Sequence, residues 1–242
     1  MTQNIYDDET FFAGYSKLGR SVEGLEGAAE WPVLRALLPE MKGARVLDLG
    51  CGFGGFGRWA REAGAAEVLG IDVSEKMLAR ARETTDDPAI GYARQDLERL
   101  ALQRDSFDLV YSSLVFHYIE NLRGLFEQVQ RGLVDGGSFV FSVEHPMYTA
   151  PSEPTWVVDA QGNRTWPVDR YLEEGPRSTD WLAKGVVKQH RTVATYINIL
   201  LQSGFALTHV EEWGPTAEQI ALRPALEAER HRPPFLLIAA RR

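Results

Sequence analysis

The chain has a single cysteine, Cys51, among 242 residues. One thiol cannot form an internal disulfide or a thiolate zinc cluster. Long hydrophobic runs are also missing, because no run approaches the roughly 20 residues that span a bilayer. Residues 1–10 are polar and acidic, unlike a secretory signal. We therefore expect a soluble, cytoplasmic protein with no membrane partner.

Positive charge is scarce as well. The chain has 26 Lys and Arg against 34 Asp and Glu, a formal net charge of −8. An acidic chain without a dense basic tract is a poor candidate for nucleic-acid binding, so none is expected. Hydrophobic residues make up 44%, enough for a sizeable core. The length suits one α/β domain, with or without a cap.

Short apolar runs alternate with amphipathic stretches in the middle of the chain. Strands are predicted at 45–49, 68–72, 90–94, 107–112, 139–143, 205–213 and 235–240. Helices are predicted at 56–63, 75–83, 122–133 and 192–203, with helical character also at 10–42 and near 216–230. Strands that alternate with helices indicate βαβ units and an α/β fold with a doubly wound parallel sheet.

The pattern divides one domain into four parts. Residues 1–43 form a helical cap, 44–144 the ligand-binding core, and 191–242 a C-terminal helix and strands. Between His145 and Gln189 the periodicity is weak, with five prolines and three tryptophans. A stretch this long is uncommon as a plain connection, so 145–190 is predicted to be a lid or insertion.

A glycine-rich turn follows the first predicted strand. Residues 46–54 read Val-Leu-Asp-Leu-Gly-Cys-Gly-Phe-Gly. The glycines permit a tight turn and close approach of the backbone to a ligand. Asp48 ends the strand two residues before Gly50, where it would repel a pyrophosphate and attract an ammonium or sulfonium. Asp72, 22 residues after Gly50, suits a carboxylate that accepts hydrogen bonds from a ribose diol.

The glycines alone leave the ligand open. Gly50, Gly52 and Gly55 also fit the dinucleotide pattern G-x-G-x-x-G. A nicotinamide-dependent oxidoreductase on a related fold is therefore one alternative. A protein that binds the cofactor without catalysis is another, although a closed lid has little use in a pure scaffold.

Taken together, the motifs resemble those of the class I S-adenosylmethionine-dependent methyltransferases. The turn at 46–54 resembles their first motif, Gly70-Ile-Asp-Val-Ser their second, and Gln95-Asp-Leu the adenine-binding corner. The branch that includes ubiquinone and menaquinone C-methyltransferases is the most similar. The resemblance implies a Rossmann-like, seven-stranded, mostly parallel sheet whose last strand is antiparallel, and methyl transfer from S-adenosylmethionine to a small organic acceptor.

The resemblance also implies a set of cofactor-binding residues. Asp72 would accept from the ribose hydroxyls, the Asp96 carboxylate from the adenine amine, and the Leu97 N–H would reach a ring nitrogen. The full predicted set is Tyr15 from the cap with Asp48, Gly50, Cys51, Gly52, Asp72, Val73, Asp96, Leu97 and Ser112.

Methyl transfer by in-line displacement needs no general acid, and needs a base only if the acceptor must lose a proton. His145 follows the fifth predicted strand and His190 precedes a helix, so both are candidate bases. Both also have a structural alternative, His145 as a strand-ending residue that bonds the lid backbone and His190 as a capping or surface residue. For His117 a structural role is favoured. No cluster of metal ligands stands out, so no metal is predicted.

Overall fold

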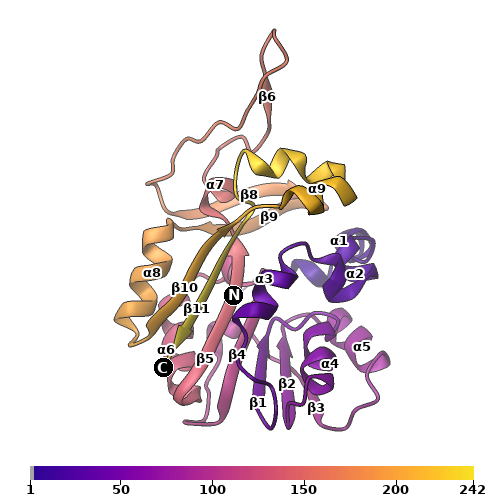
Figure 1. Ribbon diagram of the computed structural model, residues 1–242, viewed down its shortest axis with the longest axis vertical. Helices are drawn as coiled ribbons and strands as arrows, with labels where there is room; N and C mark the ends of the chain where they lie inside the picture. The colour runs from indigo at the N-terminus through magenta and orange to yellow at the C-terminus, as the bar shows by residue number, and fades with distance from the viewer. Residues whose placement is uncertain (1–2) are drawn as a thin grey trace.

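The computed structural model describes residues 3–242, so the first two residues of the predicted cap lie outside it. A seven-stranded sheet forms the centre (Figure 1), in the order β10-β11-β5-β4-β1-β2-β3. Its strands are β1 (Arg45–Leu49), β2 (Glu67–Asp72), β3 (Ile90–Arg94), β4 (Phe107–Ser113), β5 (Leu133–Glu144), β10 (Ala206–Trp213) and β11 (Phe235–Arg241). Strands β1 to β5 pair in parallel, whereas β11 is antiparallel to both neighbours. The predicted fold class is confirmed.

Alternate strand residues face opposite layers, because successive side chains of a strand point to opposite faces. Leu47 belongs to the core beneath α6 (Leu122–Gly132) and α8 (Val193–Gln202). Val46 belongs to the core beneath α3 (Trp31–Leu37) and α4 (Gly55–Glu62). The sheet is thus covered on both faces, which explains why its parallel strands read as continuous apolar runs.

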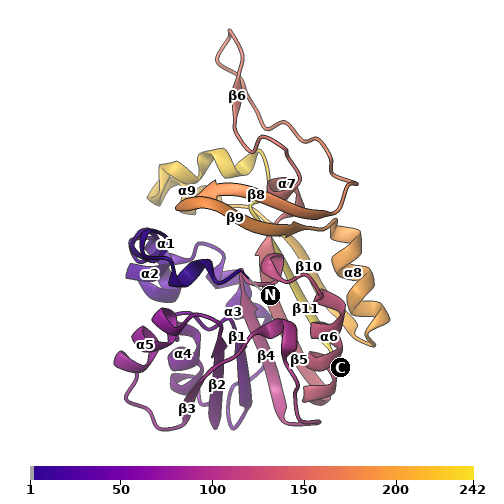
Figure 2. The ribbon, with the colours of Figure 1, turned by 180° about the vertical axis from the view of Figure 1, so that it is seen from behind.

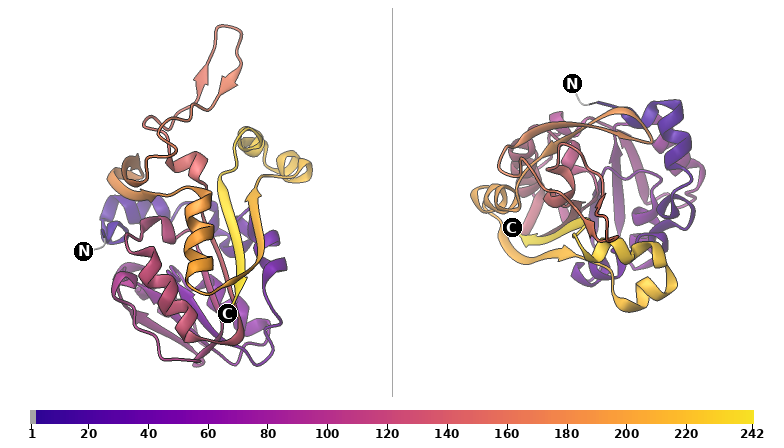
Figure 3. Two further views of the ribbon diagram at one scale, coloured as in Figure 1. Left: turned by 90° about the vertical axis from the view of Figure 1, so that its left-hand side faces the viewer. Right: turned by 90° about the horizontal axis from the view of Figure 1, so that it is seen from above.

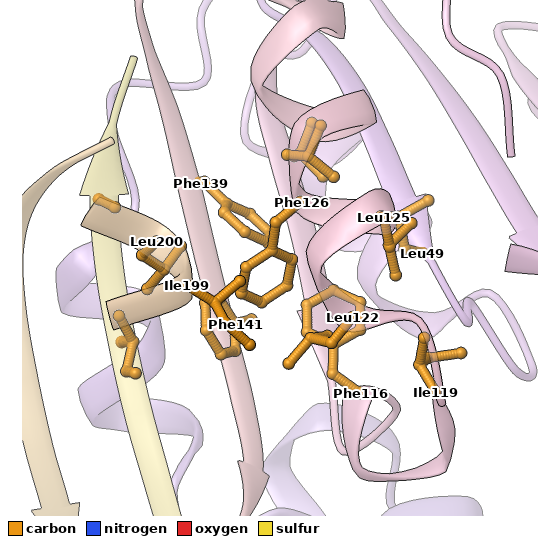
Figure 4. Packing of buried hydrophobic residues seen from close by; sticks show 14 of the residues in the cluster. Leu49, Phe116, Ile119, Leu122, Leu125, Phe126, Phe139, Phe141, Ile199 and Leu200 are labelled. Atoms are coloured by element: carbon orange, nitrogen blue, oxygen red, sulfur yellow. The ribbon is translucent and has the colours of Figure 1, made fainter. Parts of the chain in front are cut away.

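Aromatic side chains fill the first of these cores. Phe116, Phe126 and Phe141 converge between α6 and β5 (Figure 4), with ring centroids 5.2–5.4 Å apart. All three are fully buried. Tilted and edge-on packing at these distances is favourable for aromatic rings. This core holds the sheet rigid below the edge where its parallel strands end.

The N-terminal segment is helical, as predicted, but broken into short pieces. They are η1 (Ile5–Asp7), α1 (Glu9–Tyr15), α2 (Gly19–Val22) and η2 (Gly24–Gly27), followed by α3. Two of these pieces, α2 and η2, pack closely at Gly27, where an added Cβ would lie 2.3 Å from the Gly19 carbonyl oxygen. Asp7 attaches the segment to the core by accepting a hydrogen bond from Ser74 Oγ at 2.6 Å. Ser74 also caps α5 (Glu75–Glu83), the helix predicted at 75–83.

Residues 145–190 are more regular than their sequence pattern indicates. The segment contains α7 (Pro146–Thr149), a short pair β6 (Val157–Val158) and β7 (Arg164–Thr165), and a longer hairpin β8 (Gly175–Trp181) and β9 (Ala183–His190). The β6–β7 pair projects away from the body of the molecule (Figure 3). The β8–β9 ribbon crosses above the ends of the parallel strands (Figure 2).

Two further elements complete this end of the molecule. The predicted polar helical stretch consists of α9 (Ala217–Leu222) and η5 (Pro224–Arg230).

Within residues 3–242, no helix has the length and apolar character needed to cross a membrane.

Candidate functional site

The glycine turn joins β1 to α4 at the carboxyl end of the sheet. Gly50, with φ +75°, donates its N–H to the Ile71 carbonyl at 2.7 Å. A Cβ at Gly50 would lie 2.2 Å from Val115, so a larger residue does not fit. Gly52 has φ +52° and open space where a Cβ would stand. A ligand can therefore approach the backbone closely here.

Asp72 ends the neighbouring strand, β2, and lies across the turn. Its carboxylate accepts hydrogen bonds from the N–H groups of Gly52 and Ser74, both at 2.9 Å. These bonds orient both oxygens and leave each with a further lone pair for a hydroxyl donor. Burial raises the pKa of Asp72, while the backbone hydrogen bonds oppose that rise.

Asp48 lies beneath the turn and is 3% exposed. Burial, together with the nearby charge of Asp72, raises its pKa to about 8. A second buried carboxyl whose pKa is raised by burial and by the charge of Asp72 disfavours a further negative charge and favours a cation. The site therefore suits a sulfonium-bearing cofactor better than a pyrophosphate, in agreement with the sequence argument.

A narrow cleft runs along the ends of β1, β2 and β4. Its lining includes many of the predicted cofactor residues, namely Tyr15, Gly50, Gly52, Asp72, Val73, Asp96 and Leu97. The cleft is also lined by Ser113, the last residue of β4, and by residues that the sequence analysis did not name, among them Tyr6, Leu114 and Tyr118. The signal available for Leu114 and Tyr118 was their position in the connection that follows β4, since ligands of such sheets bind where the parallel strands end.

Three predicted cofactor residues do not line this cleft. Asp48 lies below the turn, and the Cys51 side chain is buried, with its Sγ close to Gly70. Ser112 is fully buried and donates its hydroxyl to the Leu49 carbonyl at 2.7 Å. Its neighbour Ser113 lines the cleft instead, because adjacent strand residues face opposite sides.

A second cavity of about 480 Å³ adjoins the cleft. It lies between the N-terminal segment, the ends of β4 and β5, the β8–β9 ribbon and residues 223–235. Tyr6, Tyr15, Leu114 and Tyr118 line both spaces. The Tyr6 ring lies edge-on to Tyr15 and Tyr118, with centroids 5.2 and 6.0 Å away. We call these three tyrosines the tyrosine collar.

The two candidate catalytic histidines lie outside both spaces, and both of their ring nitrogens are engaged. His145 Nδ1 accepts from the Met147 N–H at 3.0 Å, and Nε2 lies 2.8 Å from Glu212 Oε1. His190 Nδ1 lies 2.8 Å from Thr149 Oγ1, and Nε2 lies 2.9 Å from the Tyr171 carbonyl. Burial lowers the pKa of both. This geometry disfavours a role as base for either histidine and fits His145 as a strand-ending residue. The capping or surface alternative for His190 is wrong, because the side chain is buried and Thr192 caps α8.

His117, in contrast, lines the larger cavity. Its Nδ1 accepts from the Glu144 N–H at 3.3 Å, which places the proton of the neutral ring on Nε2. Burial lowers the pKa of His117 to about 4, so the ring stays neutral. Beside it, Lys188 Nζ contacts both carboxylate oxygens of Glu144 at 2.6 and 2.8 Å.

The tryptophans divide between cavity and packing. Trp181 and Trp213 line the larger cavity. Trp156 and Trp166 instead pack on the Arg232 guanidinium, whose carbon lies 5.1 and 3.7 Å from their ring centres. Among residues 3–242, no three His, Cys, Asp or Glu side chains are grouped as ligands for a metal.

Comparison with known proteins identifies the family. Residues 47–141 match the model of a methyltransferase domain. A crystal structure of an S-adenosylmethionine-dependent methyltransferase from Mesorhizobium loti is 62% identical, covers 90% of this chain and 100% of its own, and superposes with a TM-score of 0.88. An uncharacterized protein of Haemophilus influenzae is 36% identical over 99% of this chain and 97% of its own length.

A third relative is similar over a shorter stretch. The malonyl-[acyl-carrier protein] O-methyltransferase of Enterobacter lignolyticus is 39% identical over 109 residues, 45% of this chain and 42% of its own. The Mesorhizobium match, in contrast, covers 90% of this chain. On these grounds the chain belongs to the S-adenosylmethionine-dependent methyltransferases.

Proposed function

We propose that this enzyme methylates a small organic acceptor held in the 480 Å³ cavity, with the cofactor in the adjoining cleft. The observation that carries the proposal is the shared boundary. Tyr6, Tyr15, Leu114 and Tyr118 line both spaces, so a group in one can face a group in the other. In-line displacement requires such an arrangement of donor and acceptor.

The cleft residues have distinct proposed roles. Asp72, oriented by two backbone N–H groups, accepts from the ribose hydroxyls. Gly50 and Gly52 let the backbone approach the ligand. Asp96, which caps the short helix η3 (Leu97–Arg99) by accepting from the Glu98 N–H, and the Leu97 N–H face the adenine. A bound cation would lower the pKa of Asp48, and the ionised carboxylate would then stabilise that positive charge from beneath the turn.

When bound, S-adenosylmethionine supplies a methyl group on a sulfonium. The chain itself contributes orientation and the exclusion of water. Burial raises the pKa of each tyrosine of the collar, so Tyr6, Tyr15 and Tyr118 are neutral phenols that donate hydrogen bonds. Glu144 is paired with Lys188, and its pKa is lowered. These residues position an acceptor rather than remove a proton from it.

Residues 145–190 are proposed to act as the lid, and 1–43 as the cap. Both segments supply walls of the cavity, the cap through Tyr15 and Arg20 and the lid through Tyr148 and Trp181. A wall built from separate segments can open for entry and then close around the acceptor.

The name of the Enterobacter relative suggests one acceptor, a malonyl group on a carrier protein. The similarity to that relative spans 109 residues, whereas the cavity lining extends from Tyr6 to Phe235. A match of this length does not include the whole lining, so the acceptor does not transfer with it. We therefore propose only the small organic acceptor.

Calorimetric titration with S-adenosylmethionine, S-adenosylhomocysteine and NADH tests the proposal first. We expect micromolar binding of the first two ligands and none of NADH. An acceptor screen follows, with mass spectrometry of products. Binding of NADH alone would favour the oxidoreductase alternative, and cofactor binding without any methylated small molecule would favour a non-catalytic role.

A further inference from the structure

Two buried cations face each other across the β8–β9 ribbon. Arg177 on β8 pairs in register with Lys188 on β9, and both line the larger cavity. Arg177 is 8% exposed and Lys188 is 5% exposed. Like charges directly opposite on neighbouring strands repel each other, and burial increases the cost. Such a pair needs negative charge nearby.

Only one of these two cations has a carboxylate partner. Lys188 is paired with Glu144, as described above. The Arg177 guanidinium donates to the backbone carbonyls of Ala150, Pro176, Arg170 and Glu173, at 2.5–3.4 Å. Across the part of the chain that the structure describes, no carboxylate forms an ion pair with Arg177 within 4.0 Å.

The other charged groups of the cavity do not remove this imbalance. Arg20 is paired with Glu30 at 2.5 Å, Arg223 with Glu23 at 2.8 Å, and Glu229 with Arg232 at 3.3 Å. Asp180 is exposed and accepts from the Gly185 N–H at 3.1 Å. The inner face of the ribbon therefore carries one positive charge in excess.

A buried hydroxyl lies on the same face of β8. Thr179 is two residues from Arg177, so both side chains point to the same side of the strand. Thr179 lines the cavity, and its Oγ1 is buried with no hydrogen-bond partner. Buried polar groups are normally satisfied, so an unpartnered donor beside an unpaired guanidinium indicates a missing ligand group.

We propose that Arg177, Thr179 and Lys188 form a subsite for an anionic oxygen group, a carboxylate or a phosphate, on the methyl acceptor. This inference rests on the proposed function, because it takes the cavity to be the acceptor site. The anion would lie against the ribbon, away from the turn that carries Asp48 and Asp72. The acceptor would thus be held by its charged end, with the rest of the molecule toward the tyrosine collar.

The test uses aromatic probes, which suit a cavity lined by tyrosine and tryptophan. Calorimetry would compare 3-phenylpropionate, 2-phenylethyl phosphate and the neutral 3-phenylpropionamide, with S-adenosylhomocysteine present. We expect the acid or the phosphate to bind at least about tenfold more tightly than the amide, since a charged hydrogen bond contributes strongly. The anion that binds more tightly shows whether the subsite recognises a carboxylate or a phosphate.

Three variants locate the subsite. Arg177→Gln should weaken anion binding by about tenfold or more, and Thr179→Val by a few-fold. Arg230→Gln is the matched control, because it removes one charge from an exposed arginine that is not part of the cavity lining. It should leave anion binding unchanged. If Arg177→Gln fails to fold, Thr179→Val decides, since it removes no bond found within the protein.

Several results would overturn the subsite. They are equal affinity for acid and amide, no anion binding up to about 10 mM, unchanged binding in both subsite variants, or an equal loss in Arg230→Gln. Failure of the anion test while S-adenosylhomocysteine still binds leaves the proposed function standing. Anion binding without methylation of any small molecule would support the subsite and contradict the proposed function.

Discussion

The Asp72 carboxylate accepts a hydrogen bond from the Gly52 N–H at 2.9 Å, so the end of β2 holds the glycine turn that follows β1. Asp72→Asn keeps the shape of the side chain, but its amide N–H₂ would face the N–H group of either Gly52 or Ser74 and could not accept a hydrogen bond from it. We expect the Kd for S-adenosylmethionine to rise about tenfold or more, equivalent to about 1.4 kcal/mol, in calorimetry. Asp87→Asn, at a surface ion pair with Arg61, is the control. Unchanged affinity in Asp72→Asn contradicts the ribose role.

Asp48 makes stability depend on pH in a defined direction. Its pKa is about 8 in the folded protein and near 3.8 in the unfolded chain. Between these values the Asp48 carboxyl is protonated in the folded state and ionised in the unfolded state, so the free energy of unfolding falls as pH rises toward 8. Asp48→Asn has no proton to lose, so the Tm of the variant minus that of the wild type should grow from about pH 5 to pH 8. A constant difference in scanning fluorimetry would count against a raised pKa.

The tyrosine collar should act through its rings rather than through ionisation. Burial raises the pKa of Tyr6 well above its ordinary value, so the phenol stays neutral. Tyr6→Phe should keep kcat within about threefold, whereas Tyr6→Ala, which opens the boundary between cleft and cavity, should lower kcat by about tenfold or more. Steady-state kinetics on an acceptor from the screen measures both. Equal losses in the two variants would show that the hydroxyl itself is needed.

His190 is expected to stabilise the fold and not to transfer protons. His190→Gln should lower the Tm, because it disrupts the bonds to Thr149 and Tyr171, but kcat of the folded fraction should stay within about threefold. Burial lowers the pKa of His190, so the stability it contributes is present above its unfolded pKa and is lost as pH falls from there through its lower folded pKa. A large loss of kcat with an unchanged Tm would restore His190 as a base.

Arg232 joins the proposed lid to the C-terminal segment. Its guanidinium carbon lies 4.0 and 3.7 Å from the ring centres of Tyr148 and Trp166, and the side chain is 4% exposed. Arg232→Ala should lower the free energy of unfolding by about 1–3 kcal/mol and speed proteolysis within residues 150–170. The control is Arg230→Ala, an exposed side chain whose ion pair with Glu227 measures 3.6 Å. Equal proteolysis rates in the two variants would contradict this role of Arg232.

The central sheet could be predicted because the apolar runs in the sequence match the buried positions of the strands in the structure. Val46 and Leu47 are both apolar, and each meets a covered face of the sheet. Asp48 and Asp72 end adjacent parallel strands, and the sequence places both at one edge once the strands are identified. Their approximate environment therefore follows from strand pairing alone.

The β8–β9 ribbon could not be predicted in this way. Its inner positions hold Arg177, Lys188 and His190, which face polar partners rather than a hydrophobic core. An inward charge removes the alternation of apolar and polar residues that identifies a half-buried strand. The side-chain alternation of a strand also explains why Ser113 lines the cleft and the predicted Ser112 does not, since a shift of one residue in a strand reverses the face.

The sequence by itself determined the order of strands and helices, the glycine turn and the two carboxylates beside it, because these depend on contacts between near neighbours in the chain and on strand pairing. The tertiary structure alone decided that Tyr6 meets Tyr118, that His145 and His190 are engaged elsewhere, and that Arg177 lies opposite Lys188. These pairings join segments far apart in the sequence or set the register of a hairpin. Only the packing of the cap, the sheet edge and residues 145–190 around a common cavity brings them together.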